Sequence, residues 1–253
     1  MKNYLQKITT NGKAIYLAYD HGFEHGPEDL PGSSLDPQYI LDIAVEGGYN
    51  AVIFQKGLAE KYYTGTIYEK KIPLILKING KANIWKGGDI YSYQNCSVKY
   101  AKELGASAVG YTIYLGSEHD GKMFADFGRI VEEAHQLKMA AIAWVYPRGE
   151  FVKDETSKEI TAYAARIGLE LGADMVKIKY SGSKENFEWA VKAAGKTKVV
   201  LSGGPKVAEE EFLKILKEVM MAGAAGVAVG RNVWLSEKPL VITEKIKQIV
   251  FNS

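Results

Sequence analysis

The chain of 253 residues is 47% hydrophobic and 25% charged, with a formal net charge of +2. This composition is typical of a globular protein large enough to bury an extended core. Because the charge is nearly balanced, it does not favour binding to nucleic acid or to a membrane surface. No apolar run approaches the roughly 20 residues of a membrane span, residues 1–4 do not resemble the start of a signal peptide, and a single cysteine, Cys96, excludes an intrachain disulfide framework. We therefore expect one cytoplasmic domain over residues 1–253.

Short apolar runs recur along the chain, each followed by a loop and a helical pattern. They are nearly continuous rather than alternating, as in strands that are covered on both faces. Eight strands that alternate with helices predict an α/β fold, a single (β/α)8 TIM barrel, although an open doubly wound sheet would have the same local pattern. The predicted strands are residues 14–18, 51–54, 74–77, 108–112, 140–144, 175–178, 199–202 and 226–229.

A weak internal repeat supports this number of strands. A glycine precedes the second, fourth, sixth and eighth predicted strands, at Gly48, Gly105, Gly172 and Gly223. Glycine at such a position adopts the left-handed conformation that ends a helix. Apolar residues at helical spacing predict helices over 122–138 and 207–222 and a closing helix over 238–251, whereas 61–72 has no clear period and predicts a loop or irregular helix.

Two lysines, Lys177 and Lys179, lie in and just after the sixth predicted strand. Side chains two apart in a strand point to the same face, so we expect both lysines inside the barrel. Burial and the repulsion between two ammonium groups both lower the pKa of a lysine, which a nucleophilic amine requires near neutral pH. The alternative is that one or both lysines stay solvated at the rim of the barrel.

Small residues follow the last two predicted strands. Ser202, Gly203 and Gly204 end the seventh strand, and Gly230 and Arg231 follow the eighth. In many barrels these positions form a phosphate site, because glycines expose backbone N–H groups and arginine adds a charged fork. Two ordinary tight turns are the alternative. We expect a phosphorylated substrate.

Further polar residues follow the first and fifth predicted strands. If a lysine forms an iminium with a carbonyl substrate, Asp20 and Tyr146 are candidates for proton transfer. The alternative is that Asp20 is a cap or turn residue and Tyr146 an aromatic residue at the rim of the barrel. His21 and His25, with Asp20 and Glu24, could instead bind a divalent metal. Their spacing in a glycine-containing loop does not by itself bring the two rings together.

Five stretches resemble the archaeal-type class I fructose-1,6-bisphosphate aldolases. They read LAYDHGFEHGP, WVYPRG, VKIKY, LSGGP and VGRNVW, in this order between about residues 14 and 234. The resemblance implies a (β/α)8 barrel that reversibly cleaves fructose 1,6-bisphosphate to dihydroxyacetone phosphate and glyceraldehyde 3-phosphate. It also implies Schiff-base chemistry without a metal or other cofactor, and a homo-oligomer such as a decamer.

The resemblance assigns roles to individual positions. Lys177 is the implied Schiff-base lysine, Tyr146 the general acid/base and Asp20 an acidic residue that assists proton transfer. Lys179 does not match the nucleophile, and we expect it to be a cationic neighbour that favours the neutral amine of Lys177. The implied substrate-binding residues are Ser202, Gly203, Gly204, Gly230 and Arg231, with Arg148 for the distal phosphate and His25 and Lys179 beside the substrate.

Two other functions stay open at this point. The first is a related Schiff-base synthase that transfers a three-carbon unit between phosphosugars in aromatic amino-acid precursor synthesis. The second is a phosphate-binding barrel that is metal-dependent or not catalytic. Activity on fructose 1,6-bisphosphate without an added acceptor would separate the aldolase from the synthase.

Overall fold

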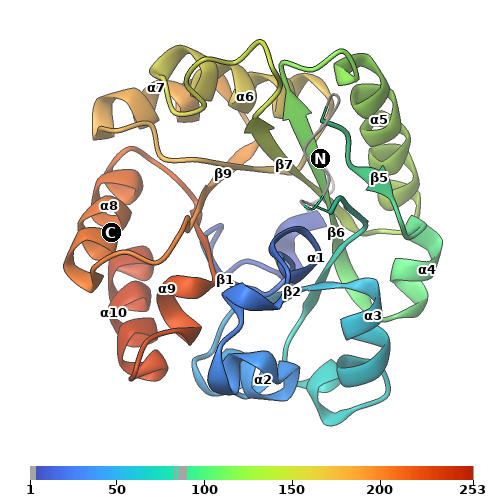
Figure 1. The fold of residues 1–253 in the computed structure, drawn as a ribbon, viewed down its shortest axis with the longest axis vertical. Helices are drawn as coiled ribbons and strands as arrows, with labels where there is room; N and C mark the ends of the chain where they lie inside the picture. The colour runs from blue at the N-terminus through green and yellow to red at the C-terminus, as the bar shows by residue number, and fades with distance from the viewer. Residues whose placement is uncertain (1–3, 83, 85–89, 253) are drawn as a thin grey trace.

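The computed structural model describes residues 4–82, 84 and 90–252; residues 1–3, considered above for a signal peptide, lie outside this set. Eight parallel strands close into a barrel in the order β1-β10-β9-β8-β7-β6-β3-β2 (Figure 1). The prediction of a TIM barrel is thus confirmed, and the open sheet was wrong. The strands are β1 (Ala14–Ala18), β2 (Ala51–Gln55), β3 (Leu74–Lys77), β6 (Ala106–Leu115), β7 (Ala140–Pro147), β8 (Met175–Ile178), β9 (Lys198–Ser202) and β10 (Gly226–Val229).

Most of the helices ring the barrel on its outside (Figure 1). Serine or aspartate side chains cap several of them, as when Ser157 accepts a hydrogen bond from the backbone N–H of Ile160. Gly172, at φ 82°, ends the helix before β8, as the sequence predicts. The helices are α1 (Gly22–His25), α2 (Pro37–Glu46), α3 (Lys56–Leu58), α4 (Val98–Glu103), α5 (Asp120–Gln136), α6 (Lys158–Glu170), α7 (Lys184–Ala193), α8 (Glu209–Met221), α9 (Arg231–Trp234) and α10 (Pro239–Phe251).

Residues 61–72, for which the sequence predicts a loop or an irregular helix, contain irregular helical turns. A π-helical turn covers Ala59–Tyr63, and a 3-10 turn covers Ile67–Lys70. After β3 comes a two-residue strand, β4 (Asn79–Gly80), which pairs antiparallel with β5 (Tyr93–Gln94). In the part of the chain that the structure describes, no helix is both long and apolar enough to cross a membrane.

Two neighbouring strands, β6 and β7, are longer than the sequence predicts. The sequence predicts a strand that ends at Trp144, with Tyr146 in a loop, but β7 continues to Pro147. It does so because β6 is also long, and the two strands pair in register through Tyr114 with Tyr146 and Leu115 with Pro147. Tyr146 is therefore held by a sheet rather than by a loop.

Side chains that alternate along the strands form two cores. One set fills the inside of the barrel and includes Tyr16, Ile75, Ile142 and Met175. The intervening residues pack outward against the helices. Because strand side chains repeat with a period of two, a residue two positions beyond an interior residue points into the barrel mouth.

Candidate active site

A cavity of about 350 Å³ opens at the C-terminal ends of the strands, the face where TIM barrels place their chemistry. Strand periodicity supplies its walls: Trp144 and Lys177 stand two residues beyond the interior residues Ile142 and Met175. All of the site residues predicted from the sequence line this one cavity. They are Asp20, His25, Tyr146, Arg148, Lys177, Lys179, Ser202, Gly203, Gly204, Gly230 and Arg231.

Lys177 is buried, with 6% of its surface exposed, and its ammonium lies 5.2 Å from the ring centroid of Trp144. Asp20 lies on the same side of the cavity and is also buried. Burial raises the pKa of Asp20, but the charges of Lys177 and Lys77 outweigh burial and hold this pKa below its ordinary value. Asp20 is therefore an ionised carboxylate at neutral pH.

Lys77, the last residue of β3, is a site residue that the sequence analysis missed. It is 3% exposed, its Nζ lies 3.8 Å from Asp20 Oδ2, and it is 5.7 Å from the ring centroid of Trp144. Lys77 and Lys177 thus both lie over the Trp144 indole, and the charges of both lower the pKa of Asp20. A lysine that ends an otherwise apolar strand is visible in the sequence, and this signal could have identified it.

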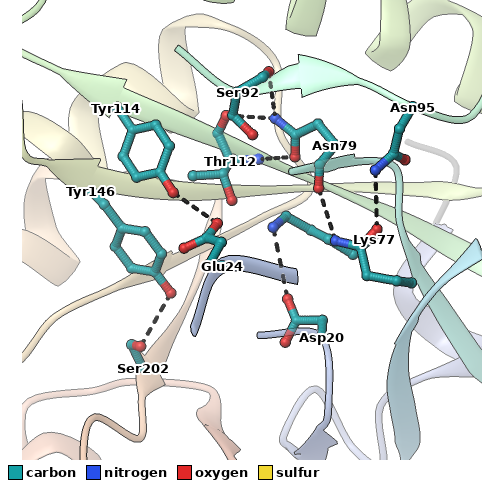
Figure 2. A network of polar contacts seen from close by, with 11 residues as sticks. Asp20, Glu24, Lys77, Asn79, Ser92, Asn95, Thr112, Tyr114, Tyr146 and Ser202 are labelled. Atoms are coloured by element: carbon teal, nitrogen blue, oxygen red, sulfur yellow. Dashed lines mark hydrogen bonds and ion pairs between the residues drawn. The ribbon is translucent and has the colours of Figure 1, made fainter. Parts of the chain in front are cut away.

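A buried polar network fixes the end of β3 beside Lys77 (Figure 2). The side chain of Asn79 donates to the backbone carbonyls of Thr112 at 2.9 Å and Ser92 at 3.2 Å, and it accepts from the Thr112 N–H at 2.8 Å. Gln55 donates to the Asn79 carbonyl at 3.0 Å, and Asn95 donates to the Gln55 side chain at 3.3 Å. These hydrogen bonds tie the ends of β2, β3 and β6 to one another beside the cavity.

Tyr146 points into the cavity from β7, and its hydroxyl lies 3.2 Å from Ser202 Oγ (Figure 2). The neighbouring Tyr114 hydroxyl donates to Glu24 at 2.7 Å and so ties α1 to β6. Burial first, and then the charge of Glu24, raise the pKa of Tyr114, so this phenol stays protonated. The guanidinium of Arg148 lies 5.0 Å from the Tyr146 ring centroid.

The ends of β9 and β10 form a small-residue wall. A Cβ on Gly203 would lie 2.9 Å from Val229 Cα, so only glycine allows these strand ends to approach so closely. Asn232 holds this loop by donating to the carbonyls of Gly203 at 2.8 Å and Pro205 at 2.9 Å. Gly230 precedes α9 as its N-cap. Glycines at such strand ends leave backbone N–H groups accessible from the cavity.

Arg231 begins α9 and contributes the charge at this end of the cavity. Its Nη1 lies 2.9 Å from Asp29 Oδ2, and the same oxygen lies 2.8 Å from Nδ1 of His25. Asp29 belongs to the 3-10 turn Pro27–Asp29, in the loop between β1 and α2. His25 and Arg231 are therefore joined by one carboxylate.

Lys179 is not placed as expected. Its ammonium contacts Glu155 of the loop between β7 and α6, and Glu155 also accepts from Arg148 Nε at 3.1 Å. Burial lowers the pKa of Lys179, Glu155 opposes this effect, and the nearby charge of Arg148 adds to it. The cation that lies near both Trp144 and Asp20 together with Lys177 is Lys77. Lys179 follows the end of β8 at Ile178 and pairs with Glu155 at the wall of the cavity.

The two histidines considered for a metal lie close together, with ring centroids 5.6 Å apart. His21 stacks on Trp234, and burial lowers its pKa to about 4, whereas His25 contacts Asp29. Over residues 4–82, 84 and 90–252 no group of three or more histidine, cysteine or acidic side chains is arranged to hold a metal ion. The metal alternative thus has no ligand set in this part of the chain.

Comparison with known proteins agrees with this geometry. Residues 14–236 match the model of the DeoC/LacD family aldolases. A fructose-bisphosphate aldolase class 1 from Thermoproteus tenax is 50% identical over 253 residues, which cover 99% of this chain and 94% of that protein.

Two solved structures superpose over nearly the whole chain. One, a Schiff base forming fructose-1,6-bisphosphate aldolase, has a TM-score of 0.92 and 50% identity over 98% of both chains. Another, an archaeal fructose-1,6-bisphosphate aldolase with its catalytic lysine covalently bound to the carbinolamine intermediate, has a TM-score of 0.93 and 49% identity over 99% of both chains. The chain belongs to the DeoC/LacD family of aldolases, among the archaeal-type class I fructose-bisphosphate aldolases.

Proposed function

We propose that the protein is a Schiff-base aldolase that reversibly cleaves fructose 1,6-bisphosphate to dihydroxyacetone phosphate and glyceraldehyde 3-phosphate. The observation that carries this proposal is the buried Lys177, which reaches a cavity shared with a carboxylate, Asp20, and a phenol, Tyr146. A lysine amine in such surroundings is suited to attack a carbonyl carbon. The names of the relatives describe the same chemistry in those proteins.

In the forward reaction, the neutral amine of Lys177 attacks C2 of the open-chain ketose. Loss of water from the carbinolamine gives an iminium that accepts the electrons of the C3–C4 bond. As this bond breaks, the C4 hydroxyl gives its proton to Asp20 or Tyr146, and glyceraldehyde 3-phosphate leaves. Tyr146 then protonates the enamine at C3, and water releases dihydroxyacetone phosphate and regenerates Lys177.

The two ends of the cavity suit the two phosphates of the substrate. The wall of Ser202, Gly203, Gly204, Gly230 and Arg231 is our candidate site for the C1 phosphate, because backbone N–H groups and a guanidinium bind such an anion well. At the other end, Arg148 and Lys179 offer two positive charges to the distal phosphate.

Borohydride trapping tests the central step. The protein is incubated with dihydroxyacetone phosphate and reduced, and the added mass is located by peptide mass spectrometry, with a chelator-treated sample alongside. We expect an adduct on Lys177 that the chelator does not prevent and that Lys177→Met abolishes. No adduct, or normal turnover by Lys177→Met, would refute the iminium mechanism. Cleavage of fructose 1,6-bisphosphate without an acceptor separates the aldolase from the related synthase.

We also infer that residues 1–253 act as one catalytic domain in a cytoplasmic homo-oligomer, such as a decamer. Support comes from aromatic side chains on the outer helices, where Tyr163 of α6 and Trp189 of α7 are about half exposed. Exposed aromatic residues on a soluble surface often mark protein contacts. Light scattering of the purified protein would measure the subunit number, and a monomer would refute this inference.

A further inference from the structure

Two cations that line the cavity are held by a single carboxylate. Arg148 directly follows β7, Lys179 directly follows β8, and Glu155 lies in the loop that leads from β7 to α6. Arg148 Nε donates to Glu155 Oε2 at 3.1 Å, while the Lys179 ammonium contacts Glu155 Oε1. The cations are among the lining residues of the cavity, whereas Glu155 approaches them from the loop side.

The same arrangement occurs at the other end of the cavity. There Asp29, also from a loop, holds Arg231 and His25 through one oxygen, at 2.9 and 2.8 Å. Each end therefore pairs two basic side chains with one loop carboxylate. Carboxylate and phosphate oxygens compete for the same donors, because both accept charge-assisted hydrogen bonds from guanidinium and ammonium groups.

We propose that Glu155 competes with the substrate phosphate for Arg148 and Lys179, the two cations at the distal end of the cavity. In the empty enzyme Glu155 binds both cations, and it releases them when the phosphate of the aldehyde fragment binds there. This inference rests on the proposed aldolase function. Glu155 would keep two repelling cations together while the cavity is empty. Because its side chain is 37% exposed, it can turn to solvent when a phosphate dianion takes its place.

Glu155 should therefore weaken the binding of a phosphate at this end of the cavity. A ligand must compete with the internal ion pair, so its apparent dissociation constant equals the intrinsic value divided by the fraction of enzyme in which the cations are free. For an ion pair of this exposure we expect an effect of about two- to fivefold. The effect should be confined to ligands that carry a phosphate at this end.

The test uses the condensation reaction, because the aldehyde can be supplied with or without its phosphate. In Glu155→Gln we expect the KM for glyceraldehyde 3-phosphate to fall about two- to fivefold. The KM values for unphosphorylated D-glyceraldehyde and for dihydroxyacetone phosphate should stay unchanged. Glu155→Ala should act in the same direction. Glu150→Gln, an exposed position in the same loop, is the matched control and should change none of them.

Several outcomes would overturn the inference. An unchanged or raised KM for glyceraldehyde 3-phosphate in both Glu155 variants would mean that Glu155 does not compete with phosphate. Equal changes for both aldehydes would indicate a structural role. Borohydride trapping on Lys177 distinguishes the two levels of the argument: without an adduct in the wild type the aldolase proposal fails, whereas an adduct with an unchanged KM refutes only the role of Glu155.

Discussion

Replacing Lys77 with methionine removes one of the two cations beside Asp20 and keeps a side chain of similar length. The Lys77 ammonium lies 3.8 Å from the Asp20 carboxylate, and both side chains are buried. At an effective dielectric constant of 20, such a pair interacts by about 4 kcal/mol before desolvation is subtracted. An opposite charge at this range lowers the pKa of an aspartate by about one to three units.

The pKa of Asp20 is held below its ordinary value because Lys177 and Lys77 outweigh the effect of burial. With Lys77 gone we expect this pKa to rise by about one to two units, since Lys177 remains. If Asp20 accepts a proton in the reaction, the acid limb of the pH profile of kcat/KM shifts to higher pH by the same amount. A coupled assay of fructose 1,6-bisphosphate cleavage between pH 4 and 8 measures this shift.

Lys77→Arg is the matched control, because it keeps the charge and should restore the acid limb. Stability provides a second readout with a defined sign. Because the pKa of Asp20 is depressed in the folded state, its contribution is present above the unfolded pKa and is lost as the pH falls through the folded pKa. Lys77→Met should therefore unfold at a higher pH on acidification. If the acid limb of kcat/KM in Lys77→Met coincides with that of the wild type, Lys77 does not lower the pKa of a catalytic Asp20.

Three further substitutions probe other parts of the site. Tyr146→Phe should lower kcat by about 10²- to 10⁴-fold while the borohydride adduct still forms; normal turnover would remove Tyr146 from the mechanism. Gly203→Ala places a Cβ 2.9 Å from Val229 Cα, so we expect a lower melting temperature and a higher KM for fructose 1,6-bisphosphate, and unchanged values would contradict the close packing. Burial lowers the pKa of His21 from 6.5 to about 4, so the wild type should lose about 2 kcal/mol of stability between pH 7 and pH 5. Urea unfolding at the two pH values should show a smaller loss in His21→Gln, and an equal loss would refute the assignment to His21.

Much of the barrel was predictable because its strands are marked locally. The predicted bounds of β1, β3, β8 and β10 agree with the structure, since a buried parallel strand is a continuous apolar run bounded by turn residues. The period of two along a strand also predicted that Lys177 points into the barrel, as observed. All eleven site residues predicted from the sequence line the cavity, whereas another lining residue, Lys77, was not predicted.

What the sequence by itself determined is therefore the set of strands and the direction of each side chain from its own strand. The tertiary structure alone decided which side chains meet. Lys77 and Lys177 are 100 residues apart, and they share Asp20 and Trp144 only because the barrel closes with β1, β3, β7 and β8 around one mouth. Likewise, the pairing of Lys179 with Glu155 depends on the path of a loop. Periodicity is a local property, whereas contact depends on strand order and closure, which no single segment encodes.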